Sequence, residues 1–222
     1  MVFAPFALSF ILLLFLGLVA LVILVQLRVL AYAYRKIGVR PQYVFLVMLL
    51  SLFGSWINIP LYAVPVQKIL PPQEVWSFGR SYVVPPTVHT GETVIAVNVG
   101  GALIPILISI YLLLKTRMLG RMVIGTAVVA AVVHSMAELV PGVGIAVPIF
   151  IPPLVAAAVA LILAFRQAPP VAYVSGAMGT LIGADLLNLD RITQLGAPVL
   201  SIGGAGTFDG IFLTGIIAGL LA

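Results

Sequence analysis

The sequence repeatedly runs for about 20 residues with almost no charged side chain, the length that a helix needs to cross the hydrocarbon of a bilayer. The strands of a membrane barrel would instead alternate apolar and polar residues. Charged residues make up 8% of the chain, against about 25% in soluble domains. No water-soluble fold could cover so many apolar side chains with polar groups. The sequence therefore predicts an all-α fold, a polytopic bundle of transmembrane helices.

We expect one integral membrane domain over residues 1–222, with about seven membrane spans. The spans are expected at about residues 5–27, 43–62, 94–114, 122–139, 145–165, 171–189 and 197–221. A Pro-rich outer loop is expected over residues 63–93. The first apolar run lacks the basic start and the small-residue cleavage site of a signal peptide, so we interpret it as a retained span.

The charged residues predict on which side of the membrane each loop lies. Eight of the eleven Lys and Arg residues fall in the loops after the first, third and fifth spans, and these loops contain no carboxylate. They are Arg28, Arg35, Lys36, Arg40, Lys115, Arg117, Arg121 and Arg166. Short loops rich in Lys and Arg stay in the cytoplasm. The pattern predicts a multi-pass protein of the cell membrane, with its N-terminus outside and its C-terminus in the cytoplasm.

Composition also excludes several kinds of site. The sequence contains no cysteine, which excludes disulfides, thiolate nucleophiles and Cys-based metal sites. It has no G-x-x-x-x-G-K-[ST] phosphate loop and no dinucleotide-binding fingerprint. The net charge of +5 comes largely from basic residues in short loops, where they set topology, so we expect no nucleic-acid partner. The lipid bilayer is the expected partner, no cofactor is predicted, and the oligomeric state stays open.

Two aspartates within predicted spans are the main candidates for a functional site. A charged side chain in a span costs about 2.5 to 3.5 kcal/mol on insertion scales, so it needs a partner, a watery cavity or a function. Asp185 lies in the sixth predicted span and Asp209 in the seventh. Glycines around Asp209 could form a hinge or seat a substrate; they are Gly203, Gly204, Gly206 and Gly210. A helix-packing seam with one paired aspartate is the structural alternative.

A secondary polar site is predicted toward the outer side of the bundle. His134 and Glu138 are four residues apart and would share one face of the fourth span. They could form a proton relay or bind a metal, or they could simply pair with each other near the interface. Asn98 in the third span and Asn188 beside Asp185 could hydrogen-bond between helices. No metal site is predicted, because zinc needs at least a third protein ligand.

Two carboxylates on neighbouring helices support more than one function. Held close together, they cannot both ionise cheaply, so they share a proton. Such a pair can activate water and protonate a leaving group, as in aspartic proteases. It can also bind a proton or a cation in a transporter. A nonenzymatic membrane assembly protein is a third alternative, and the residues alone do not separate the three.

The stretch from Gly176 to Gly219 resembles the intramembrane aspartyl proteases of the presenilin and signal-peptide-peptidase type. Those enzymes carry a Gly-x-Gly-Asp motif; here Gly204-Ala205-Gly206 comes three residues before Asp209, and Asp185 lies in the preceding span. The resemblance implies a hydrolase that cleaves membrane peptides with Asp185 and Asp209.

The whole chain also resembles an uncharacterised prokaryotic family of small membrane proteins. The resemblance rests on a Gly-Ser-x-x-Asn-Ile-Pro stretch (Gly54 to Pro60), a Pro-Gly-x-Gly-Ile stretch (Pro141 to Ile145), and the Gly-Ala-Asp and Phe-Asp-Gly segments that contain the two aspartates. Membership of that family implies no function.

Overall fold

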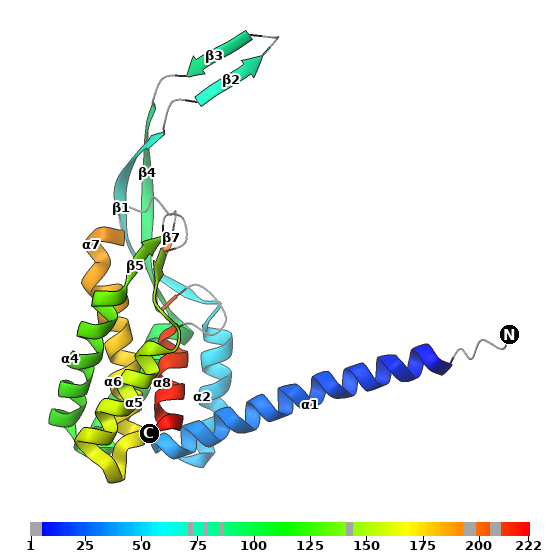
Figure 1. Cartoon of the computed structure of the whole chain (residues 1–222), viewed down its shortest axis with the longest axis vertical. Coiled ribbons are helices and arrows are strands. Elements are labelled where there is room, and N and C mark those ends of the chain that lie inside the picture. The colour runs from blue at the N-terminus through cyan, green and yellow to red at the C-terminus, as the bar shows by residue number, and fades with distance from the viewer. Residues whose placement is uncertain are drawn as a thin grey trace.

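The computed structural model is a bundle of helices with a long β-ribbon rising from one end (Figure 1). It describes residues 6–70, 73–77, 80–84, 87–140, 144–192, 199–204 and 210–222. Side chains are described over residues 10–65, 91–138, 145–191, 199–204 and 210–222. The fold is mostly helical, as the sequence predicts, but the strands in the described part of the chain correct the all-α prediction.

The helices alternate along the chain with the strands. The α-helices are α1 (Phe6–Ile37), α2 (Pro41–Gly54), α3 (Ile104–Thr116), α4 (Leu119–Met136), α5 (Ile151–Ala164), α6 (Ala168–Thr180), α7 (Leu189–Ile192) and α8 (Gly210–Leu221). Short turns of other helix types are η1 (Val99–Leu103), η2 (Phe165–Gln167), η3 (Leu181–Asp185) and η4 (Leu186–Asn188). The strands are β1 (Asn58–Leu70), β2 (Gln73–Ser77), β3 (Arg80–Val84), β4 (Thr87–Asn98), β5 (Glu138–Val140), β6 (Gly144–Ala146) and β7 (Val199–Ile202).

Proline marks the start of several helices. Pro41 is the first residue of α2, and α3, α5 and α6 each have proline in the first two positions. Proline is tolerated there because its missing N–H would have no partner inside the helix, and its fixed φ suits the first turn. The span predicted from residue 145 therefore begins as a helix only at Ile151, with Pro152 and Pro153 next, while residues up to Ala146 belong to β6.

Helix α6 lies at the centre of the bundle, where it contacts α1, α3, α4, α5 and α8. A Cβ added at Gly179 would lie 2.6 Å from the Val129 Cβ on α4, and one added at Gly183 would lie 2.5 Å from the Ala130 carbonyl oxygen. Small residues at these positions let the two backbones approach closely. A different face of α6 packs against α8, where Gly215 meets the Tyr173 ring.

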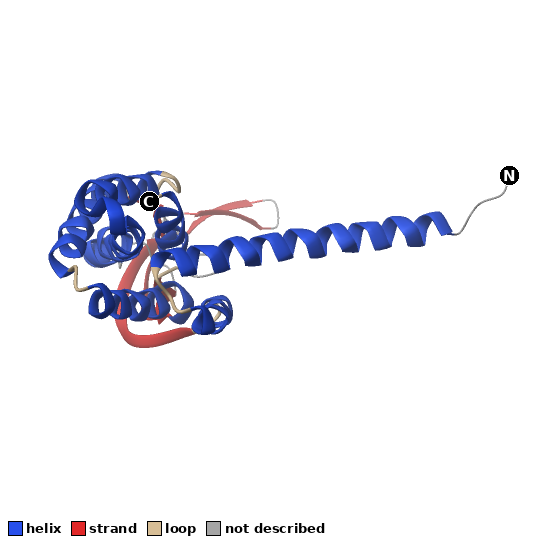
Figure 2. Ribbon diagram, turned by 90° about the horizontal axis from the view of Figure 1, so that it is seen from below, coloured by secondary structure: helices blue, strands red, loops and turns tan. Residues whose placement is uncertain are grey.

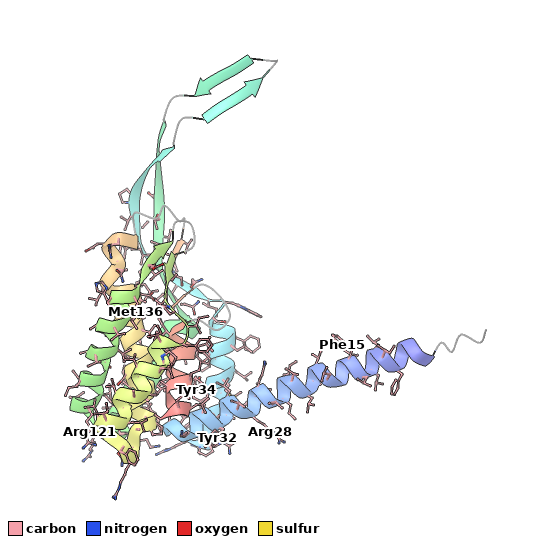
Figure 3. All side chains as sticks on the ribbon, in the orientation of Figure 1. Phe15, Arg28, Tyr32, Tyr34, Arg121 and Met136 are labelled. Carbon is pink, nitrogen blue, oxygen red and sulfur yellow. The ribbon has the colours of Figure 1, made fainter. Side chains whose placement is uncertain are left out.

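Helix α1 leaves the bundle sideways (Figures 1 and 2). Only its C-terminal end is packed, through the buried residues Ala33, Tyr34 and Ile37. The N-terminal part of the helix presents large apolar side chains on all sides, including Phe15 at 58% exposure (Figure 3). A helix that is apolar all round and has no protein neighbours suits a lipid environment.

Most of the predicted Pro-rich outer loop, residues 63–93, forms a β-ribbon instead. Strands β1 and β4 pair antiparallel from Asn58 opposite Asn98 to Leu70 opposite Thr87, and β2 pairs with β3 at the far tip. Strand β7 pairs parallel to β4, which gives the order β1-β4-β7. The prolines of β1 are tolerated because β1 is an edge strand, and its register shifts beside Pro60.

Four helical stretches of the described chain are long and apolar enough to cross a membrane. They are Phe10–Ile37, Val99–Thr116, Leu119–Met136 and Ile151–Arg191, and the last contains both α5 and α6, which pack against each other. Two shorter apolar helices are α2 and α8. The apolar helices expected of a membrane protein are therefore present.

The ends of four predicted spans need correction. The helix expected over 43–62 ends at Gly54, and residues 58–62 lie in β1. The helix expected from residue 94 starts at Val99, since 94–98 belong to β4. The helix expected over 122–139 ends at Met136, and the helix expected over 197–221 is described only from Gly210, after β7. Extended segments replace helix at these points because they pair with one another near the ribbon end of the bundle.

Candidate functional site

Asp185 ends η3, a π-helical turn that continues α6 toward the ribbon. Its carboxylate is half-buried, and its Oδ2 atom accepts a hydrogen bond of 2.8 Å from the backbone N–H of Gly203. A hydrogen bond to a carboxylate is stronger than one between neutral groups. Single π-helical turns are often found at functional sites, so the local geometry agrees with the sequence in marking Asp185.

The Gly203–Gly204 pair places the donor N–H because both residues adopt a backbone conformation that suits glycine. Their φ angles are +89° and +77°, in the left-handed region that residues with a Cβ rarely adopt. A Cβ added at Gly203 would also lie 2.6 Å from the Cβ of Ala102 in η1. Only glycine therefore allows the chain after β7 to pass so close to η1 and present its N–H to Asp185.

Asp185 lines a pocket of about 330 Å³ between the start of α5, the end of α6 and the start of α8. The polar members of its lining are Asp185, Thr180 and Thr214, and Gly210 contributes the first residue of α8. The Thr180 hydroxyl is buried and has no hydrogen-bond partner among the described residues. A buried hydroxyl without a partner is costly, so this pocket suits a ligand or a water that can bond to it.

A chain of hydrogen bonds connects the loop at Asp185 to the root of the ribbon. The fully buried Asn98 donates from Nδ2 to the Ser55 carbonyl oxygen at 2.7 Å and to Asn58 Oδ1 at 3.0 Å. Ser201 Oγ lies 2.6 Å from the same Asn58 oxygen and 2.7 Å from the Gly204 carbonyl oxygen. Residues from β1, β4 and β7 thus fix the loop whose neighbouring N–H binds Asp185.

Asn98 also caps η1, because its Oδ1 accepts a 2.8 Å hydrogen bond from the Gly101 N–H. Its predicted role in bonding between separate elements agrees with this geometry, although Asn98 lies at the end of a strand and not inside a helical span.

The predicted pairing of His134 with Glu138 on one helical face is wrong. Helix α4 ends at Met136, Ala137 is extended, and Glu138 is an exposed residue of β5. His134 lies instead 3.3 Å from Asn188, measured from Nδ1 to Nδ2. Asn188 is 1% exposed and donates to the carbonyl oxygens of Gly183 and Ala184. It therefore satisfies carbonyl groups at the irregular end of α6.

Asp209 and Gly206 lie outside the described residues. The residue that follows Asp209, Gly210, begins α8 and lines the same pocket as Asp185. The described residues contain no group of three or more His, Cys, Asp or Glu side chains that could hold a metal ion.

Sequence reasoning missed the two threonines of the pocket. Thr180 and Asp185 are five residues apart, which in a regular α-helix would place them on different sides. A π-helical turn bonds residues five apart, and so brings both to one pocket. The sequence carries no local signal for this change of helix type.

A family model described as "Protein of unknown function (DUF1614)" matches residues 52–221, which include β1 to β7, the Asp185 pocket and α8. No curated protein and no solved structure matches the chain. None of these comparisons supports the resemblance to presenilin-type proteases, whereas the expected match to a family without an assigned function is confirmed. The chain therefore belongs to the DUF1614 family.

Proposed function

We propose that this chain is a multi-pass protein of the cell membrane that hydrolyses peptide bonds of membrane peptides with Asp185 and Asp209. One observation carries the proposal: Asp185 and Gly210, the residue after Asp209, line one pocket. Both aspartates would otherwise cost free energy in an apolar bundle without return.

The proposed chemistry needs one carboxylate and one carboxylic acid at the scissile bond. The carboxylate takes a proton from water as the water oxygen attacks the carbonyl carbon. The carboxylic acid donates its proton to the amide nitrogen as the C–N bond breaks. The Gly203 N–H supports this arrangement, since its hydrogen bond fixes the orientation of the Asp185 carboxylate.

An extended substrate has a place to bind beside Asp185. In the described sheet, β7 is an edge strand, and the chain leads directly from β7 to Gly203. An extended peptide can add to such an edge through backbone hydrogen bonds. In this arrangement the peptide would lie next to the N–H that binds Asp185.

The proposed topology has seven crossing segments, α1 to α6 and α8, with the N-terminus outside and the C-terminus in the cytoplasm. Two contacts between basic residues and carbonyl groups support a common cytoplasmic end. Lys36 Nζ donates to the Leu220 carbonyl oxygen at 2.7 Å, and Lys115 Nζ donates to the Gly38 carbonyl oxygen at 2.5 Å. Helix α4 begins beside Arg121 at this end and finishes at Met136 at the opposite end (Figure 3). Lys and Arg gather on the cytoplasmic side of membrane proteins.

The first experiment uses a photoactivatable hydroxyethylene peptide isostere, a transition-state probe for aspartyl proteases, on the purified full chain in proteoliposomes. We expect cross-linking to the wild type and its loss in Asp185→Asn and in Asp209→Asn. Asp190→Asn is the matched control, since Asp190 is exposed and lies just beyond the same helical segment. Equal labelling of all four proteins would contradict the hydrolase.

A second experiment tests whether the two aspartates share the pocket. The chain has no cysteine, so the double variant Asp185→Cys/Asp209→Cys carries the only two thiols. We expect copper phenanthroline or a short bifunctional thiol reagent to join them within one chain. The pair Asn58→Cys/Ser201→Cys is a positive control, because these side chains touch in the native fold. Cross-linking of the control alone would remove the basis for an aspartate pair.

A proton- or cation-coupled transporter is the second candidate, and one observation favours it. Extended segments interrupt the helical path before η1 and before α8, and they meet around a buried polar network. Interrupted helices of this kind form ion sites in transporters. This candidate predicts sodium- or pH-dependent flux in proteoliposomes that Asp185→Asn abolishes and that the probe leaves unchanged. If the Asn variants match the wild type in both assays, a nonenzymatic assembly role is favoured.

A further inference from the structure

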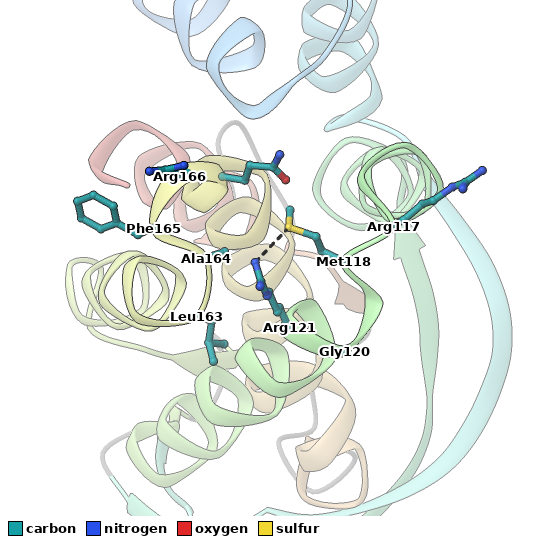
Figure 4. Close-up of a pocket in the computed structure, with 9 residues that line it drawn as sticks. Arg117, Met118, Gly120, Arg121, Leu163, Ala164, Phe165 and Arg166 are labelled. Atoms are coloured by element: carbon teal, nitrogen blue, oxygen red, sulfur yellow. Dashed lines mark hydrogen bonds between the residues drawn. The ribbon is translucent and has the colours of Figure 1, made fainter.

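A second pocket lies at the end of the bundle remote from Asp185. It has a volume of about 730 Å³ and lies between the start of α4 and the turn that joins α5 to α6 (Figure 4). Its lining comprises Arg117, Met118, Gly120, Arg121, Leu163, Ala164, Phe165, Arg166 and Gln167. In Figure 4, Arg121 extends toward Met118, and Arg117 and Arg166 lie on opposite sides of the pocket.

The three arginines give this pocket a strong positive charge. All three are exposed, and its lining contains no carboxylate. Within the described part of the chain, the acidic side chains lie on β4, on β5 or in the segment from Asp185 to Asp190, toward the ribbon end. Guanidinium groups match phosphate oxygens through paired N–H donors, and they do so better than ammonium groups.

The rim of the pocket is strongly apolar. Phe165 is 80% exposed, Ile162 is 82% exposed, and Leu119, beside the pocket at the start of α4, is 61% exposed. Large apolar side chains with this exposure would be unfavourable in water and are suited to acyl chains. A headgroup-sized basic hollow bordered by such side chains differs from a purely aqueous anion site, which would have no use for the apolar rim.

We propose that this pocket, through Arg117, Arg121 and Arg166, binds the phosphate headgroup of an anionic phospholipid, with the acyl chains lying along the exposed apolar side chains. Basic pockets between membrane helices bind lipid phosphates in this way. The site is separate from Asp185 and does not depend on the proposed hydrolase. The lipid occupies the junction of α4 with the α5–α6 turn and holds these helix ends together.

Native mass spectrometry of the full chain in mixed micelles tests this proposal. We expect one-to-one adducts with phosphatidylglycerol that are much more abundant than those with phosphatidylcholine. The triple variant Arg117→Gln/Arg121→Gln/Arg166→Gln should weaken phosphatidylglycerol binding roughly tenfold or more, because each arginine near a lipid phosphate contributes separately. The matched control, Arg28→Gln/Arg35→Gln/Arg40→Gln, removes the same charge from exposed positions outside the pocket and should retain binding.

Further arms make each outcome decisive. Arg→Lys at the same three positions keeps the charge but loses the paired donors, and it should bind with intermediate affinity; it also serves as a folded variant if the Gln form is unstable. Equal losses in the pocket and control variants would overturn the proposal in favour of a general surface-charge effect. Tight binding of soluble inorganic pyrophosphate without a preference for phosphatidylglycerol would also overturn it, since the ligand would then be a free anion.

Discussion

The buried Asn98 offers a quantitative test of the network that supports the Asp185 loop. Replacing Asn98 by alanine removes three hydrogen bonds at once: those to the Ser55 carbonyl, to Asn58 Oδ1 and from the Gly101 N–H. Asn58 is exposed, so its oxygen regains water and keeps its contact with Ser201. Ser55 and Gly101 are buried, and their backbone groups lose their partner.

The size of the effect follows from these two backbone groups. A buried polar group left without a partner costs about 1 to 3 kcal/mol. Two such groups give an expected loss of about 2 to 6 kcal/mol in the free energy of unfolding for Asn98→Ala. The control Asn58→Ala removes an exposed side chain that shares the same network, and should cost about 1 kcal/mol or less.

Equilibrium unfolding in mixed micelles with increasing dodecyl sulfate can measure both variants. Trp56 follows Ser55 in the sequence, so its fluorescence reports on the region that loses Asn98. The expected order of stability is wild type, then Asn58→Ala, then Asn98→Ala. If Asn98→Ala were as stable as Asn58→Ala, the buried network would not hold the ribbon root to the bundle, and the reasoning would fail.

Two other contacts yield predictions of their own. Gly179→Ala should cost about 1 to 3 kcal/mol, because its Cβ would overlap α4; Gly120→Ala, which meets nothing within 4 Å, is the control, and equal thermal midpoints for the two would refute close packing. Lys36→Met should speed hydrogen exchange at the end of α8, since it removes the charged donor to Leu220. Arg35→Met should leave that exchange rate unchanged, and faster exchange there would contradict the stated cause.

Hydropathy located the helices well but misplaced several of their ends. The apolar residues 94–98 and 199–202 look the same in a sliding window whether they form a strand or the end of a helix. The choice depended on pairing, because β4 meets β1 along the ribbon and β7 from the distant end of the chain. Local propensity has no access to partners so far apart in sequence.

The same limit applies to the candidate site. Asp185 stood out in the sequence because a charge in an apolar run needs an explanation. Its hydrogen-bond donor, Gly203, was identified only as one glycine of a cluster, and Thr180 was not identified at all. The His134–Glu138 spacing suggested a pair that the end of α4 prevents.

The sequence by itself determined that this chain is a helical protein suited to a bilayer, because about 20-residue apolar runs have no other stable solvent. It also determined which residues are chemically unusual, since each charge among apolar residues carries a free-energy cost. Only the tertiary structure decided which backbone N–H binds Asp185 and which hydroxyls share its pocket. Those choices depend on strand pairing, a π-helical turn and close glycine contacts, and each of these arises from segments that meet only in the folded chain.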